Sequence, residues 1–238
     1  MQLHIYKDGD AVCEALAEWI VELMNKTLQQ KERFTWALSG GETPKKLYQL
    51  LASKKFSKKI NWSKIFIFWG DERVVPFDDE RSNAKMAYDN LLYNVAIPSS
   101  QINKILTDVT PEESAKQYEK LLHKYFDDKQ TTFDLALLGM GDDGHTLSLF
   151  PDSENLNDKA SWIKTDNIEH TGMKRITLMP AVINRSCAIV FLVTGKNKAK
   201  VLKEILKEQL QNYPASLIKP LTGELHWFVD EAAGITIK

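Results

Sequence analysis

Two kinds of hydrophobic pattern alternate along the chain: short, continuous apolar runs, and longer stretches in which apolar residues recur every three or four positions. The longer stretches predict amphipathic helices, because that spacing places the apolar side chains on one helical face. Residues 11–28 show it with a stripe made of Val12, Leu16, Trp19, Ile20, Leu23 and Met24. Further helices are predicted over residues 44–51, 83–93, 111–126 and about 198–210.

The short apolar runs predict buried strands. They cover residues 34–38, 65–69, 133–138, 175–179, 188–193 and 225–229. Apolar strands that alternate with amphipathic helices indicate an α/β protein with a mostly parallel sheet and helices on both faces. We therefore expect a single domain over residues 1–238, with any ligand bound beyond the carboxyl ends of the strands.

A glycine pair follows the first predicted strand, within the sequence SGGETP at residues 39–44. Gly40 and Gly41 let the backbone approach an anion closely, and the following helix N-terminus adds free N–H groups and the positive end of its dipole. The hydroxyl groups of Ser39 and Thr43 are further donors. The loop predicts a phosphate site, although it lacks the GK[ST] of a nucleotide P-loop. An ordinary tight turn with a helix cap is the alternative.

A second glycine-rich turn, GMGDDGH at residues 139–145, follows the strand at 133–138. It contains GxGxxG, but the acid expected about 20 residues later in a dinucleotide site would fall in a polar stretch. His145 is more informative, because a histidine on such a turn reaches solvent and can serve as a general base at neutral pH. Asp143 is close enough to orient His145 or to hold substrate.

Three cationic residues lie at other strand ends. Arg73 belongs to GDER, residues 70–73, and an arginine there can bind phosphate bidentately. A structural cluster of ion pairs is the alternative. Lys198 opens the helix after the strand at 188–193, and Arg175 opens another strand. For both residues a solvated surface position is the alternative.

The composition is typical of a globular protein and argues against several other classes of protein. The 238 residues are 43% hydrophobic and 26% charged, which is typical of a globular chain. The net charge of −1 argues against a nucleic-acid partner, and no apolar run approaches the roughly 20 residues of a membrane span. Two cysteines, Cys13 and Cys187, are too few for a disulfide framework and favour a cytoplasmic location. No HExxH, HxH or paired Cys/His spacing predicts a metal site.

Together these motifs resemble the 6-phosphogluconolactonase family, within the glucosamine/galactosamine-6-phosphate isomerase superfamily. The resemblance runs from about residue 34 to 233. The stretches that carry it are ALSGGETPKKLYQLL, WGDERVVPFDDERSNAKMA, FDLALLGMGDDGHTLSLFP, KRITLMP, VTGKNKAKVL and PASLIKPLTGELHWFVDEAA. It implies an α/β fold with a Rossmann-like parallel sheet, and neither a metal nor an organic cofactor.

The resemblance also implies the activity: hydrolysis of 6-phospho-D-glucono-1,5-lactone to 6-phospho-D-gluconate in the oxidative pentose phosphate pathway. His145 would then activate water, while Arg73 and Lys198 hold the phosphate together with the loop at 39–43. Weaker candidates for contact with the sugar or phosphate are Asp71, Asn83 and Arg175. Backbone N–H groups of the glycine turn around Gly141 are candidate oxyanion donors. The expected partner is this small phosphorylated lactone, with no nucleic acid, membrane or obligate protein partner.

Two other functions stay open. Glucosamine-6-phosphate deaminases share the fold and phosphate loop, but they look like DEY where this chain has Asp71-Glu72-Arg73. They also read toward Asn-Glu-Pro where this chain has LSLFP at residues 147–151. A non-catalytic sugar-phosphate sensor would need no base at position 145. Residues 152–172 match the family weakly and are expected to form a variable loop.

Overall fold

The computed structural model describes residues 1–127, 129–168 and 172–237. Its centre is a seven-stranded sheet of order β1-β10-β9-β6-β2-β3-β5, in which every neighbouring pair is parallel. The strands are β1 (Gln2–Tyr6), β2 (Phe34–Leu38), β3 (Ile65–Trp69), β5 (Ile102–Asn103), β6 (Leu135–Leu138), β9 (Ala188–Val193) and β10 (Glu224–Asp230). The predicted α/β class with a mostly parallel sheet is confirmed.

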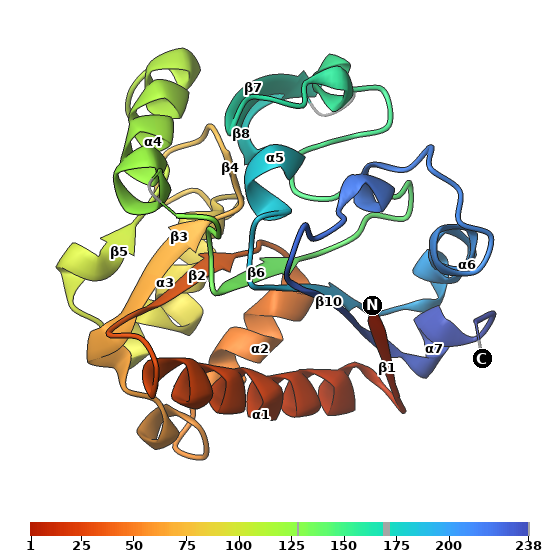
Figure 1. Cartoon of the computed structure of the whole chain (residues 1–238), viewed down its shortest axis with the longest axis horizontal. Helices are drawn as coiled ribbons and strands as arrows, with labels where there is room; N and C mark the ends of the chain where they lie inside the picture. The colour runs from red at the N-terminus through yellow and green to blue at the C-terminus, as the bar shows by residue number, and fades with distance from the viewer. Residues whose placement is uncertain (128, 169–171, 238) are drawn as a thin grey trace.

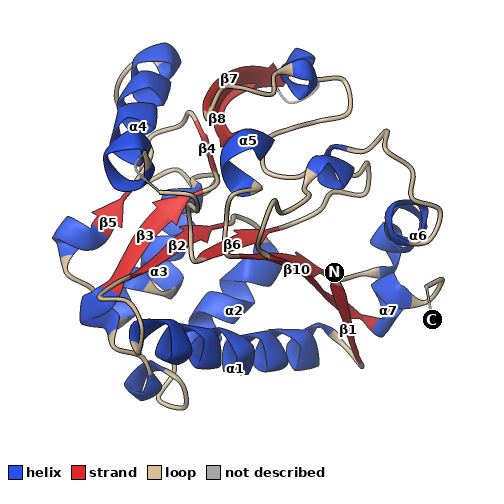
Figure 2. Cartoon of the chain, viewed as in Figure 1, coloured by secondary structure: helices blue, strands red, loops and turns tan. Residues whose placement is uncertain are grey.

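Helices cover both faces of this sheet (Figures 1 and 2). The long helix α1 (Gly9–Leu28) and α2 (Glu42–Ala52) lie below the sheet in this view, and α4 (Pro111–Phe126) stands above it. The other helices are α3 (Asn83–Asn90), α5 (Pro180–Ile183), α6 (Ala199–Leu206) and α7 (Glu231–Gly234). Strand residues such as Trp36 and Phe68 are fully buried between the two layers.

A second sheet of three antiparallel strands changes the expected architecture. Its order is β4 (Asp71–Arg73), β8 (Met173–Leu178) and β7 (Ile163–Ile168). The run at 175–179, expected in the parallel sheet, thus belongs mainly to this small sheet. The expected loop at 152–172 contains β7. This strand shows no apolar run in the sequence, because it includes the polar residues Lys164, Asp166 and Asn167. Residues 169–171 of that stretch lie outside the described residues.

Several element boundaries also differ from expectation. The predicted helix at 83–93 ends at Asn90, and the one at about 198–210 ends at Leu206. Strand β1 was not predicted, because it forms the sheet edge and its first residues are exposed. Strand β5 is only two residues long, which is too short for a periodic signal.

The strand order creates a crevice at one end of the main sheet. From β2 the chain continues to β3 and β5 on one side, and β6 then returns to the other side of β2. The loops that leave the carboxyl ends of β2 and β6 therefore diverge, which is the arrangement in which open α/β sheets bind ligands. Both glycine-rich turns of the sequence lie at this point.

Candidate active site

A cavity of about 280 Å³ opens at the carboxyl ends of β2, β3, β6 and β9. Of the residues singled out in the sequence, it is lined by Ser39, Gly40, Gly41, Thr43, Asp71, Arg73, Asn83, Gly141, His145, Arg175 and Lys198. Asp143 is not in the lining but contacts His145. The topology thus gathers these residues from six separate segments of the chain.

The glycine turn after β6 holds His145 in place. The His145 carbonyl accepts a hydrogen bond from Gly141 N–H at 2.8 Å, and the Gly141 carbonyl accepts one from Gly144 N–H at 3.2 Å. A Cβ on Gly141 would lie 2.1 Å from His145 Nδ1, so only glycine leaves room for the imidazole. These bonds also occupy the N–H groups of Gly141 and Gly144, so these two groups are not free to bind an oxyanion.

His145 and Asp143 form a close pair. The imidazole Nδ1 lies 2.6 Å from Asp143 Oδ1, and the same oxygen accepts the His145 backbone N–H at 3.0 Å. Burial alone would raise the pKa of Asp143, but the hydrogen bonds and charge of His145 lower it below its ordinary value. The imidazole also stacks on Phe150, with ring centroids 4.3 Å apart. An ionised Asp143 at Nδ1 leaves Nε2 as the basic nitrogen of the neutral imidazole.

The loop between β2 and α2 is held from below by Tyr48. The Tyr48 hydroxyl donates to the Ser39 carbonyl at 2.8 Å and accepts the Ser39 N–H at 3.0 Å. Gly41 precedes α2 with a φ of 105°, a left-handed conformation that favours glycine. Gly40 packs so closely on Asn83 that a Cβ would lie 1.9 Å from Oδ1. Ser39, Gly40 and Gly41 line the cavity, so the backbone of this loop reaches it at the start of a helix.

Cations face one another across the small sheet. Arg73 of β4 and Arg175 of β8 are direct partners in the antiparallel register, a placement that is unfavourable for like charges. The Nε atoms of both are buried without a hydrogen-bond partner among the described residues, as is Asn83 Oδ1. Burial lowers the pKa of Arg175, against the opposing effect of Asp71, whose Oδ2 lies 3.9 Å from its Nη1. Lys198 adds a third cation to the lining. Facing cations with unused donors are the chemistry of an anion site.

Two acidic residues, Asp71 and Glu72, accept hydrogen bonds beside these cations. Asp71 Oδ2 accepts the Ser148 hydroxyl at 2.6 Å, and its Oδ1 accepts Asn83 Nδ2 at 3.2 Å. Glu72 is almost fully buried and is not among the residues that line the cavity. Its carboxylate accepts the backbone N–H groups of Arg73, Asn83 and Ala84 at 2.7–2.8 Å. Burial raises the pKa of Glu72 to about 7, despite these hydrogen bonds. Glu72 thus joins the start of α3 to β4.

The cavity also contains residues that the sequence analysis did not single out. Thr194, after β9, shares a 3.0 Å hydroxyl hydrogen bond with Thr43 and so links β9 to α2. Leu147 lines the cavity from the segment after His145. The position of Thr194 at a strand end was a usable signal, whereas nothing in the sequence marks an isolated leucine as part of a polar site.

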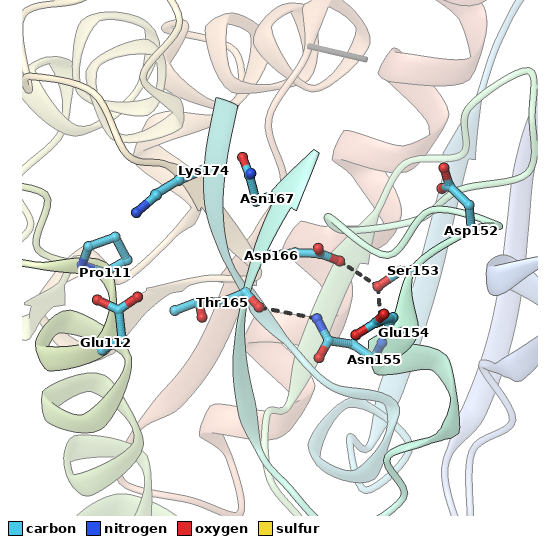
Figure 3. Close-up of a pocket in the computed structure, with 10 residues that line it drawn as sticks. All are labelled: Pro111, Glu112, Asp152, Ser153, Glu154, Asn155, Thr165, Asp166, Asn167 and Lys174. Carbon is cyan, nitrogen blue, oxygen red and sulfur yellow. Dashed lines mark hydrogen bonds between the residues drawn. The ribbon is translucent and has the colours of Figure 1, made fainter. Parts of the chain in front are cut away.

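A larger hollow of about 770 Å³ lies beside the small sheet (Figure 3). Figure 3 shows Glu112 on one side of strands β7 and β8 and Ser153 and Asn155 on the other, with Lys174 on β8 itself. Its charged residues are carboxylates apart from Lys174, and it contains no histidine. Of these two cavities, only the smaller one combines a histidine with facing cations.

Two further features of the described residues bear on function. No group of three or more His, Cys, Asp or Glu side chains in the described part of the chain is arranged to hold a metal ion. Within the same residues, no helix has the length and apolar character that crossing a membrane requires.

The chain is similar in sequence and in structure to several known proteins. Residues 7–227 match the family described as glucosamine-6-phosphate isomerases/6-phosphogluconolactonase. The chain is 40% identical to the 6-phosphogluconolactonase of Synechocystis sp., over 100% of this chain and 98% of that protein. It resembles the crystal structure of 6-phosphogluconolactonase from Thermotoga maritima with a TM-score of 0.84 and 31% identity, covering 96% and 99% of the two chains. A monomeric glucosamine-6-phosphate deaminase has the same fold, with a TM-score of 0.85 at 19% identity over 99% and 100% of the chains.

Proposed function

The chain belongs to the glucosamine-6-phosphate isomerase/6-phosphogluconolactonase family, and we propose that its residues 1–238 act as one domain that hydrolyses 6-phospho-D-glucono-1,5-lactone to 6-phospho-D-gluconate. The single observation that carries this function is the meeting of the His145–Asp143 pair with the Arg73–Arg175 pair in one small cavity. The lactonase relatives at up to 40% identity over nearly the whole chain support the same activity. Two free cysteines support a cytoplasmic enzyme.

The substrate phosphate binds to the cationic side of the cavity in this proposal. Arg73 and Lys198 contact the phosphate oxygens, and the backbone of the loop at 39–43 adds donors at the start of α2. Asp71, Asn83 and Arg175 contact the sugar or the phosphate. A bound dianion removes the repulsion between the facing arginines and supplies acceptors to their unpartnered Nε atoms.

The lactone carbonyl then lies beside His145. The imidazole takes a proton from water, and the hydroxide formed adds to the lactone carbonyl carbon. When the tetrahedral intermediate collapses, the bond from that carbon to the ring oxygen breaks, and the proton on His145 passes to the ring oxygen. Asp143 stabilises the imidazolium between these two transfers. Binding of the remote phosphate orients the carbonyl for attack.

A coupled assay tests the proposal. Fresh lactone is generated in situ by a glucose-6-phosphate dehydrogenase, and its disappearance is followed with and without the protein, because the lactone also opens spontaneously. We expect the protein to accelerate opening well beyond the background trace. Identical traces, or release of ammonia from glucosamine-6-phosphate, would instead support a sensor or a deaminase.

A further inference from the structure

Leu147 lies in a backbone conformation that leucine rarely adopts. Its φ is 56°, and it occupies the first position of a two-residue turn closed by hydrogen bonds between Thr146 and Leu149 in both directions, at 3.3 and 2.9 Å. A positive φ at this position of a tight turn is normally supplied by glycine, because a side chain crowds the neighbouring carbonyl. Backbone strain of this kind persists only where the surrounding structure holds it, and it is common at functional sites.

The surroundings of this turn fix it against the small sheet. Ser148, the second turn residue, donates its hydroxyl to Asp71 Oδ2 at 2.6 Å and its N–H to Thr177 Oγ1 at 3.2 Å. The Leu147 side chain lies over Gly70, where a Cβ would come within 2.7 Å of Leu147 Cδ2. Leu147 is therefore held at the junction of β3 and β4, next to Asp71.

This placement gives the cavity a partly exposed apolar wall beside its charged residues, whereas the other apolar side chains of the lining, Pro44, Met140, Leu192 and Val193, are buried. Leu147 lines the same cavity as Asp71, Arg73 and Arg175, and it follows His145 by two residues. A glycine at position 147 would satisfy the turn without strain but would leave that wall empty. The chain therefore has a leucine at a position where the backbone conformation favours glycine.

We propose that Leu147 determines specificity for the cyclic substrate, by packing its side chain on the C–H face of the lactone ring. This inference rests on the proposed lactonase activity. In the proposed function Arg73, Lys198 and the loop at 39–43 hold the phosphate, so the apolar side chain of Leu147 acts on the ring and not on the anion. Because the contact exists in the ground state and the transition state alike, its loss changes KM more than kcat.

The experiment compares substitutions at two residues with the same backbone. Gln209 has a φ of 58°, is exposed, and does not line the active-site cavity. Leu147→Asn and Leu147→Gly are matched with Gln209→Asn and Gln209→Gly, because asparagine and glycine both accept a left-handed backbone. The thermal midpoint, kcat, KM for the phosphorylated lactone and inhibition by inorganic phosphate are measured for the unsubstituted protein and each variant.

For both Leu147 variants we expect KM to rise about tenfold, the size of effect expected from one or two buried methyl groups, with kcat changed less than about threefold. Inhibition by inorganic phosphate should stay unchanged, and the Gln209 variants should keep the original KM. An unchanged KM in Leu147→Asn with its fold intact overturns the inference, and so does an equal loss of phosphate inhibition. If Leu147→Gly fails to fold, Leu147→Asn decides. A lack of activity in the unsubstituted protein overturns the proposed function instead.

Discussion

At the scale of single residues, the site depends on contacts between side chains that are close in sequence or in strand register. His145 and Asp143 are two residues apart, and their 2.6 Å contact follows from the glycines around them. Arg73 and Arg175 are about a hundred residues apart, and only the antiparallel register makes them neighbours. The first pair could be predicted from the sequence, and the second could not.

Replacing His145 tests the proposed base. The imidazole is 31% exposed, so a smaller side chain should be tolerated by the fold. His145→Ala should lower kcat by roughly 10²–10⁴, the usual contribution of a positioned acid–base group. The measurement is the coupled assay with the spontaneous rate subtracted, and circular dichroism checks the fold. A rate close to that of the unsubstituted protein would remove His145 from the mechanism.

Replacing Arg73 or Lys198 tests the phosphate contacts. Each substitution by alanine should lower kcat/KM for the phosphorylated lactone by the equivalent of about 2–3 kcal/mol, because it removes a charged hydrogen-bond donor from the phosphate. The effect should appear as a lower ratio of kcat/KM between the phosphorylated lactone and unphosphorylated gluconolactone. Lys174 is exposed, and it lines the larger hollow, so Lys174→Ala is a control of the same charge change. If the ratio is unchanged in both variants, neither residue binds the phosphate.

At the scale of elements, the sequence predicted what continuous apolar runs can show. Strands β2 and β9 are buried along their lengths and β3 is buried except at Phe66, so each appears as an apolar run with a candidate site residue after it. Strand β4 is different, because Asp71, Glu72 and Arg73 resemble a polar turn until the partner strand β8 is known. The small sheet, and with it the neighbourhood of Arg175, therefore required the structure.

Glu72 connects two elements, and its protonation should affect stability. A carboxyl group whose pKa is raised on folding, here from 4.5 to about 7, binds a proton more readily in the folded protein than in the unfolded one. Its favourable contribution is therefore complete below pH 4.5 and lost as the pH rises to about 7. Glu72→Gln should lower the free energy of unfolding by about 1–3 kcal/mol, because its amide cannot accept the N–H of Ala84.

Urea denaturation at pH 5 and pH 7.5 measures this difference. The margin of the unsubstituted protein over Glu72→Gln should be larger at pH 5. Glu22→Gln, at an exposed position of α1, is a control for the loss of one carboxylate. A margin that widens toward pH 7.5 would contradict the raised pKa.

At the scale of the whole molecule, the two ends of the chain meet at one edge of the main sheet. β1 pairs in parallel with β10, and His4 stacks on Phe228 with ring centroids 4.4 Å apart. His4 Nε2 also lies 3.2 Å from His226 Nδ1, and His226 Nε2 lies 3.1 Å from Glu224. The sequence does not predict this edge of the sheet, because β1 has no continuous apolar run.

Acid should loosen this edge. Burial, and then the nearby His226, lower the pKa of His4 below 6.5, so the unfolded chain takes up a proton more readily than the folded one. The contribution of His4 to stability is therefore present above pH 6.5 and is lost as the pH falls. His4→Phe keeps an aromatic ring on Phe228 and removes the proton. Its thermal midpoint should fall less between pH 7.5 and 5.5 than that of the unsubstituted protein, and an equal fall would contradict this account.

The facing arginines have a practical consequence for handling the protein. We expect two guanidinium groups held opposite one another to bind a small dianion from the buffer, such as phosphate or sulfate. Preparations in such buffers will melt at a higher temperature, because a ligand of the folded state shifts the equilibrium by mass action. The same anions should raise the apparent KM linearly with their concentration, as competitors of the substrate phosphate. Kinetic measurements on this enzyme should therefore use a buffer with a monovalent anion, with the ionic strength set by chloride.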